Sequence, residues 1–112
     1  MSQLTTHILD TSIGKPAEGV EVTLEQKSND DWKKIAGGIT NADGRIGDLL
    51  TKEAFLETGT YRLLFETTTY FSRQNKSTFY PRVTIEFSVT DRTHYHVPLL
   101  LNPFGYSTYR GS

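Results

Sequence analysis

The chain has 112 residues, 36% of them hydrophobic and 12% aromatic, which predicts one compact domain spanning residues 1–112. Its 12 Lys and Arg residues nearly balance 13 Asp and Glu residues, and a net charge of −1 argues against nucleic acid as a main partner. There is no cysteine, which excludes disulfides, cysteine metal ligands and a cysteine nucleophile.

The ends of the chain carry no pattern typical of a cellular address. Residues 1–7 lack the basic and then apolar segment of a secretory signal, and no later segment is apolar for long enough to span a membrane. The last three residues, Arg-Gly-Ser, do not form a peroxisomal address. We therefore expect a cytoplasmic protein with no membrane partner.

Short runs of alternating or β-branched residues, separated by turn residues, predict strands along most of the chain. The clearest run follows Tyr80-Pro81, where Val, Ile, Phe and Val alternate with polar residues. The strands are expected at residues 4–9, 20–25, 32–40, 46–51, 60–67, 80–89, 93–101 and 106–110. One short helix is expected at 70–76, and a loop or weak helix at 52–58. This pattern predicts an all-β, immunoglobulin-like antiparallel β-sandwich.

A tight turn is predicted at residues 41–44, Asn-Ala-Asp-Gly, because Asp-Gly tolerates left-handed backbone conformations. Arg45 follows directly and stands at the mouth of this turn. A guanidinium in that place is suited to bind a planar anion or to stabilise an oxyanion. The alternative is a solvated arginine with no chemical role.

The three histidines of the chain are His7, His94 and His96. On a strand His94 and His96 point to the same face, because side chains alternate with a period of two. A His-x-His pair is able to chelate a metal, but no cysteine or acidic cluster stands beside it. The alternatives are acid–base chemistry, since imidazole titrates near neutral pH, and half-buried polar residues without a role.

The chain end alternates aromatic and hydroxyl residues up to Tyr109, and a turn at residues 102–105 precedes it. This pattern predicts a last strand that leads residues 109–112 back to the body of the protein. There the phenol of Tyr109, the guanidinium of Arg110 and the hydroxyl and carboxylate of Ser112 would lie close together. The alternative is a solvated polar tail.

Three stretches together resemble the 5-hydroxyisourate hydrolases, the transthyretin-like enzymes of urate breakdown. They are LTTHILD at residues 4–10, DGR at 43–45, and HYHVPLL at 94–100 together with the ending YSTYRGS at 106–112. The Tyr-Arg-Gly-Ser ending is specific for the enzymes, since hormone-carrying transthyretins do not end in this way. The resemblance spans nearly the whole chain.

The resemblance implies a transthyretin-like sandwich of two four-stranded sheets with one short helix, assembled as a homotetramer, a dimer of dimers. It implies hydrolysis of 5-hydroxyisourate to 2-oxo-4-hydroxy-4-carboxy-5-ureidoimidazoline, in a channel between dimers and without a metal or organic cofactor. The alternative is a transthyretin-like carrier of small ligands or hormones without catalysis. A structural or adhesive module is a third hypothesis.

The resemblance also implies a set of catalytic residues, which are His7, Arg45, His96 and Ser112. Substrate binding falls to His7 and Arg45 together with Tyr109, which would line the site. His96 would activate water, His7 would orient the substrate or share the proton, and Arg45 would stabilise charge on the carbonyl oxygen. His94 lies on the same face as His96, but the family pattern assigns the role to His96.

Overall fold

The computed structural model describes residues 2–112, which form eight strands and one helix. The strands are β1 (Leu4–Asp10), β2 (Lys15–Pro16), β3 (Glu21–Ser28), β4 (Asp31–Ile39), β5 (Gly59–Phe65), β6 (Val83–Val89), β7 (Tyr95–Asn102) and β8 (Gly105–Thr108). The helix α1 covers Thr67–Ser72 and begins shortly after β5. Within the described range, no helix has the length and apolar character needed to cross a bilayer.

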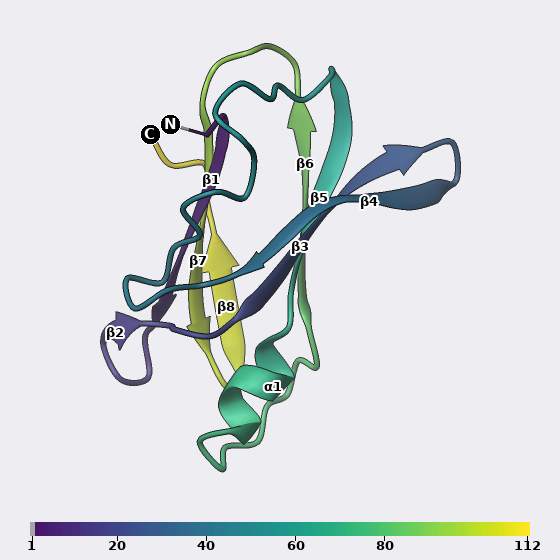
Figure 1. Ribbon diagram of the computed structural model, residues 1–112. Helices are drawn as coiled ribbons and strands as arrows, with labels where there is room; N and C mark the ends of the chain where they lie inside the picture. The colour runs from purple at the N-terminus through teal and green to yellow at the C-terminus, as the bar shows by residue number, and fades with distance from the viewer. Residues whose placement is uncertain (1) are drawn as a thin grey trace.

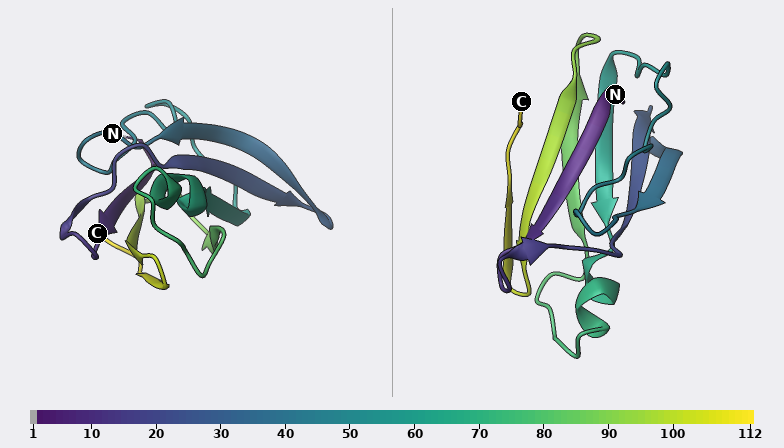
Figure 2. Two further views of the ribbon diagram at one scale, coloured as in Figure 1. Left: turned by 90° about the horizontal axis from the view of Figure 1, so that it is seen from below. Right: turned by 60° about the vertical axis from the view of Figure 1, so that its left-hand side comes forward.

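The strands form two four-stranded sheets with the orders β2-β1-β7-β8 and β4-β3-β5-β6, which pack face to face (Figure 1 and Figure 2). The hydrophobic core lies between them. In β1, Leu4 and Ile8 are fully buried, whereas Thr5 and His7 are half-buried on the opposite face. This alternation is what a strand with one face on the core requires. The predicted two-sheet sandwich with one short helix is confirmed.

Strands β1 and β7 run parallel, with Thr5 opposite His96 and His7 opposite Pro98. The expectation of a purely antiparallel sandwich is wrong for this pair, although all other strand pairs in the described residues are antiparallel. Parallel neighbours need a long connection. Here the second sheet and the helix lie between them in the chain, so short-range turn signals cannot reveal the pairing.

Two other segments differ from the expected strands and turns. Residues 46–51 contain no strand, whereas residues 52–58 form a loop, which is one of the two conformations expected there. Leu49, Leu50 and Leu56 are nevertheless buried, so this irregular segment packs against the core through its apolar side chains. Residues 15–16, which lie outside the expected strands, form β2 and pair with the end of β1. Burial of the leucines explains why the segment resembles a strand in sequence.

Helix α1 begins three residues before the expected segment and ends four residues before its end. Thr67, Tyr70 and Phe71 are buried, the i, i+3, i+4 pattern of a helix with one face on a core. The Tyr70 hydroxyl donates a hydrogen bond to Oδ2 of Asp10 at 2.7 Å. Burial, and secondly this bond to Asp10, raises the pKa of Tyr70 to about 12. The contact ties the helix to the end of β1.

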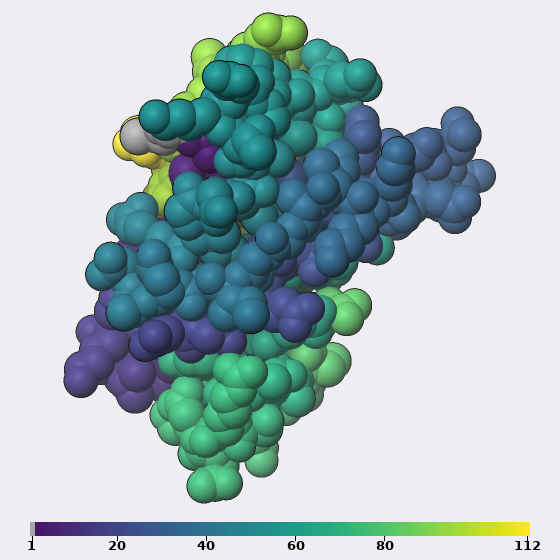
Figure 3. Space-filling view, viewed as in Figure 1, coloured from purple at the N-terminus to yellow at the C-terminus, as the bar shows by residue number. Residues whose placement is uncertain are grey.

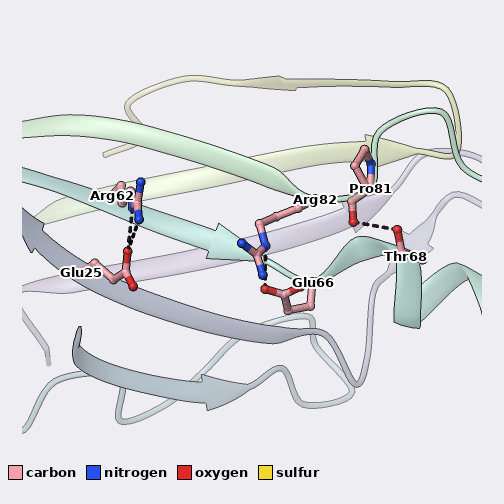
Figure 4. A network of polar contacts seen from close by, with 6 residues as sticks. All are labelled: Glu25, Arg62, Glu66, Thr68, Pro81 and Arg82. Atoms are coloured by element: carbon pink, nitrogen blue, oxygen red, sulfur yellow. Dashed lines mark hydrogen bonds and ion pairs between the residues drawn. The ribbon is translucent and has the colours of Figure 1, made fainter. Parts of the chain in front are cut away.

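The β3–β4 hairpin projects from the body of the molecule (Figure 3). Its turn is only two residues long, and Asn29 has a φ of 57° there, so both strands extend further toward the turn than the expected strands at 20–25 and 32–40. Toward the body, Arg62 of β5 binds Oε1 of Glu25 at 2.6 Å (Figure 4). The Arg62 guanidinium also lies 4.2 Å from the ring centre of Trp32. These contacts connect both strands of the hairpin to β5 within the second sheet.

Candidate active site

The pairing of β1 with β7 gathers Thr5, His94 and His96 on the face of the first sheet that points away from the core. The Thr5 hydroxyl oxygen lies 2.8 Å from Nε2 of His94 and 2.8 Å from Nδ1 of His96. The two imidazole rings are nearly parallel, with centres 6.2 Å apart and planes inclined by 18°. The predicted placement of both histidines on one face is confirmed.

Arg45 leaves a tight turn whose geometry the sequence predicts. The side-chain oxygen of Asn41 accepts hydrogen bonds from the backbone N–H of Asp43 at 2.9 Å and of Arg45 at 3.1 Å. Gly44 has a φ of 72°, a left-handed conformation that glycine adopts without strain. The expected turn at residues 41–44 is therefore present, and Arg45 leaves it in a defined direction.

The same turn is docked against β1 beside His7. The N–H of Ile8 donates to the Gly44 carbonyl at 2.9 Å, and an isolated antiparallel bridge joins His7 to Arg45. A Cβ on Gly44 would overlap the carbonyl oxygen of Ile8, so a side chain does not fit there. These contacts place Arg45 next to His7, far away in the sequence.

The chain end returns to β7 and contacts His96. The N–H of Gly111 donates to the His96 carbonyl at 2.9 Å. A Cβ on Gly111 would lie 2.5 Å from Cδ2 of the His96 ring, so this close approach requires glycine. The Arg110 guanidinium lies 4.3 Å from the ring centre of Tyr95 and donates to the Thr93 hydroxyl at 3.3 Å. The terminal segment is therefore held against the sheet and is not a free tail.

A cavity of about 250 Å³ opens where these segments meet, and we call it the histidine cavity. Four separate parts of the chain line it, through Thr5, Arg45, His94, His96 and Ser112. His7 lies beside the cavity, bridged to Arg45, and is not part of its wall. A guanidinium, two imidazoles and the chain terminus in so small a space are suited to bind an anion and to move a proton.

His7 and His96 both have a pKa below the ordinary value of 6.5. Burial is the largest cause in each, and the positive charge of Arg45 is the second. The charges of His94 and His7 lower the pKa of His96 further. Hydrogen bonding to the backbone of Asp43 acts in the opposite direction on His7. Both imidazoles are therefore neutral near pH 7 and able to accept a proton.

Tyr109 does not join the histidine cavity in this chain. Its side chain is 59% exposed and lines a larger cavity of about 340 Å³, which we call the apolar cavity. The apolar cavity lies on the other side of β7 and is lined mainly by aliphatic and aromatic side chains, which include Ile85, Phe87, Tyr95 and Val97. The terminal residues therefore do not all lie together as predicted, because Ser112 lines the histidine cavity and Tyr109 lines the apolar cavity.

Sequence reasoning overlooks Thr5 and treats His94 as a bystander. Thr5 precedes His7 by two residues, so the strand period puts both on one face, and that signal is present in the sequence. Only the register of β1 on β7 places Thr5 between the two imidazoles. Among residues 2–112, no three or more histidine or carboxylate side chains converge as metal ligands would.

Residues 4–111 match the model of the HIUase/Transthyretin family. The chain is 49% identical over 110 residues to a 5-hydroxyisourate hydrolase of Salmonella typhimurium, an alignment that covers 97% of this chain and 80% of that relative. It is 43% identical over 114 residues to the 5-hydroxyisourate hydrolase of Mus musculus, covering 99% of this chain and 96% of the mouse protein.

Two solved structures share the fold over nearly their whole length. The 5-hydroxyisourate hydrolase of Klebsiella pneumoniae superposes with a TM-score of 0.86 at 43% identity, covering 97% of this chain and 98% of that one. Sea bream transthyretin in complex with thyroxine gives a TM-score of 0.91 at 34% identity, with coverages of 98% and 95%. One is named as an enzyme and the other as a complex with a hormone, so function must be argued from the site.

Proposed function

This chain belongs to the HIUase/transthyretin family, and we propose that it is a hydrolase that opens the six-membered ring of 5-hydroxyisourate. The product is 2-oxo-4-hydroxy-4-carboxy-5-ureidoimidazoline, in the breakdown of urate. The observation that carries the proposal is the histidine cavity, where Arg45, His96 and Ser112 meet. The bacterial and mouse relatives named 5-hydroxyisourate hydrolase, at 49% and 43% identity, support it.

His96 is the proposed general base. Its Nδ1 is engaged with Thr5, which leaves Nε2 as the nitrogen that takes a proton from water. The lowered pKa keeps the ring neutral near pH 7, as a base requires. The hydroxide adds to a ring carbonyl, the adjacent C–N bond breaks, and the departing nitrogen takes up the proton that His96 carried.

Arg45 is the proposed partner of the carbonyl oxygen that becomes negative as hydroxide adds. A planar, permanently charged guanidinium suits a planar substrate that is rich in carbonyl groups and readily anionic. His7, bridged to Arg45, orients the substrate or shares the proton. Ser112 contributes its hydroxyl or its terminal carboxylate as a further polar contact in the cavity. The proposed reaction uses water and these side chains, without a metal or organic cofactor.

We further propose a homotetramer, a dimer of dimers, with active sites in the channel between dimers. Strands β6 and β8 are edge strands of their sheets, and an unpaired edge favours pairing with another copy. Tyr109 is exposed and lies apart from Arg45 and His96 within one chain. Assembly with a second copy is therefore the arrangement that allows Tyr109 to line a substrate site.

A carrier of small ligands is the alternative, because the fold is shared with sea bream transthyretin in complex with thyroxine. Identity to that structure is 34%, against 43% to the Klebsiella hydrolase. A passive carrier has no use for neutral imidazoles beside a guanidinium, whereas a hydrolase needs them. The composition of the histidine cavity therefore favours catalysis.

The proposal is tested by generating 5-hydroxyisourate in the cuvette with urate oxidase and following its ultraviolet decay. Decay that accelerates in proportion to the concentration of the protein supports the hydrolase. The matched control is a His96→Ala protein purified in the same way, which detects activity from a contaminant. Decay at the spontaneous rate in the presence of folded wild-type protein would make the carrier the better assignment.

A further inference from the structure

One hydroxyl group serves two imidazoles in the histidine cavity. The Thr5 oxygen lies 2.8 Å from Nε2 of His94 and at the same distance from Nδ1 of His96. A threonine hydroxyl has one hydrogen to donate, and its oxygen accepts through lone pairs. It therefore donates to one imidazole and must accept from the other. The protonation of one ring nitrogen decides that of the other, so His94, Thr5 and His96 form one hydrogen-bonded chain.

Two arrangements of protons in this hydrogen-bonded chain satisfy every hydrogen bond. In the first, Thr5 donates to Nε2 of His94 and accepts from Nδ1–H of His96, so that Nε2 of His96 carries no proton. In the second, Thr5 donates to Nδ1 of His96 and accepts from Nε2–H of His94, so that Nε2 of His96 is protonated. A neutral histidine accepts a proton only at the nitrogen that carries none. Only the first arrangement leaves Nε2 of His96 able to act as a base.

The surroundings hold the His96 ring in place for this bond. The terminal segment approaches so closely that a Cβ on Gly111 would stand 2.5 Å from Cδ2 and 3.2 Å from Cγ of the ring. On β1, Thr5 is fixed opposite His96 by the strand register. His94 lies nearly parallel to His96, with its Nε2 turned to the same hydroxyl. The three groups are therefore positioned by the fold and not by one another alone.

We propose that His94, acting through Thr5, is a positioning residue that keeps the proton of neutral His96 on Nδ1 and leaves Nε2 free. This rests on the proposed role of His96 as the general base. The hydrogen-bonded chain also favours the charged state that forms when His96 takes a proton, because Nδ1–H of His96 still donates to Thr5 and Thr5 still donates to His94. A doubly protonated His94 has only donors, so it forces the second arrangement and removes the base.

Several charged or titratable groups from neighbouring elements face the hydrogen-bonded chain of His94, Thr5 and His96. Arg45 from the turn, His7 from β1 and Ser112 lie in or beside the same cavity. Asp43 stands close to His7. Arg45 and His7 lower the pKa of His96, and Asp43 raises that of His7, but none of these groups donates to or accepts from the Thr5 hydroxyl. The position of the proton within neutral His96 is therefore coupled to that of His94 through the Thr5 hydroxyl.

The test measures the proton position directly by ¹⁵N–¹H correlation spectra of the imidazole nitrogens in the full-length protein near pH 7.5. In the wild type, His96 should show a protonated Nδ1 and an unprotonated Nε2. Thr5→Val removes the hydroxyl at nearly constant shape, and His94→Phe removes the acceptor for its proton. Both should shift His96 toward the Nε2–H form and lower kcat by about 10- to 100-fold, the size expected when a functional histidine loses its orienting partner.

Thr5→Ser restores the hydroxyl and should recover the wild-type proton position and most of kcat. Thr6→Val is the matched control, because Thr6 is the next residue and its buried hydroxyl donates to the Val97 carbonyl at 2.7 Å on the other face of the strand. It should leave the His96 spectrum unchanged even where it lowers the melting temperature. A loss that follows the melting temperature in all variants would assign Thr5 a merely structural role and overturn the proposal.

A wild-type spectrum with the proton on Nε2 of His96 would also overturn the proposal, as would an unchanged His96 spectrum in both Thr5→Val and His94→Phe. The spectra do not depend on turnover. If wild-type protein fails to accelerate decay of 5-hydroxyisourate, the proposed hydrolase is wrong, while the spectra still decide whether Thr5 and His94 fix the proton. The two failures are therefore distinguishable.

Discussion

Strand β7 separates two cavities of opposite character. The histidine cavity, about 250 Å³, holds Arg45, His96 and the chain terminus, whereas the apolar cavity, about 340 Å³, is walled mainly by residues such as Ile85 and Val97. Neighbouring residues of one strand serve both, because His96 faces the first and Val97 the second. The smaller cavity has groups that are suited to bind an anion and to move a proton. Convergence of charge and imidazole, and not volume, is the reason for proposing that the chemistry takes place there.

The terminal segment connects the two cavities. Tyr109 lines the apolar cavity and Ser112 the histidine cavity. Between them, Arg110 stacks on Tyr95 and Gly111 packs against the His96 ring. The last residues thus form part of the wall of a site, and changes there should act on activity more than on the stability of the sandwich.

Substitutions in the histidine cavity should lower activity, whereas a substitution on the core face of β7 should lower stability. His96→Ala should retain the fold and lose on the order of 10²- to 10⁴-fold in rate, the usual cost of removing a general base. Arg45→Ala should behave in the same way, because the charge on the carbonyl oxygen is no longer stabilised. His96 is half-buried and Arg45 is exposed, so the free energy of unfolding should change by no more than roughly 1 kcal/mol.

Val97→Ala is the matched change on the core face and should lower the free energy of unfolding by about 1–3 kcal/mol with little effect on rate. Initial rates and urea unfolding curves of the three variants make the comparison. Near-normal turnover in a folded His96→Ala protein would remove His96 from the mechanism.

The terminal segment offers the next largest effect. Removing residues 109–112 should abolish activity while the sandwich remains largely folded, because these residues follow β8, the last strand. A C-terminal affinity tag should also lower the rate, since a displacement of about 1 Å at a catalytic group costs roughly a hundredfold. An N-terminal tag is the control. Equal rates for the untagged, C-terminally tagged and truncated proteins would show that the terminus has no part in the site.

Gly111→Ala should have a smaller effect than truncation, because the chain end is still present but displaced. The added Cβ would stand 2.5 Å from Cδ2 of His96, closer than two carbon atoms approach without a shift. We expect a loss of about tenfold or more in kcat, by the same dependence of rate on position. Gly105→Ala is the control, because its nearest neighbour, Asn102, would be 3.7 Å away. Equal rates for the two variants would contradict the packing argument.

The effect of pH should be the smallest and the most specific to the histidine cavity. Burial and the charge of Arg45 hold the pKa of His96 below 6.5. Because the folded state binds this proton less readily than the unfolded state, the contribution to the free energy of unfolding is present above about pH 6.5 and is lost as the pH falls through the folded-state pKa of His96. Activity should fall in the same pH range. Arg45→Gln removes a positive charge, so the pKa of His96 and of His7 should rise.

The measurement is a proton NMR titration of the imidazole C–H signals, with Arg45→Lys as the charge-preserving control. An upward shift in Arg45→Gln that is absent in Arg45→Lys supports the electrostatic contact. The same midpoint in all three proteins would mean that Arg45 does not act on the histidines.

The local parts of this site could be predicted from sequence, and the long-range parts could not. Asp-Gly before Arg45 predicted the turn, and the spacing of His94 and His96 predicted a shared face; the structure confirms both. The parallel pairing of β1 with β7 depends on contacts across most of the chain, so the pattern neither revealed it nor showed that Thr5 lies between two imidazoles. The alternating pattern of the chain end predicts that Tyr109 and Ser112 lie together, but Tyr109 lines the apolar cavity and Ser112 the histidine cavity.

The comparison of the two cavities is tested most directly by binding urate, a planar and stable relative of the proposed substrate. Backbone and imidazole NMR shifts are recorded as urate is added to the wild-type protein. The account predicts shifts concentrated at Thr5, Arg45, His96 and Ser112, with Ile85, Phe87 and Val97 nearly unchanged. Shifts concentrated instead at Ile85, Phe87 and Val97 would place the ligand in the apolar cavity and contradict the account.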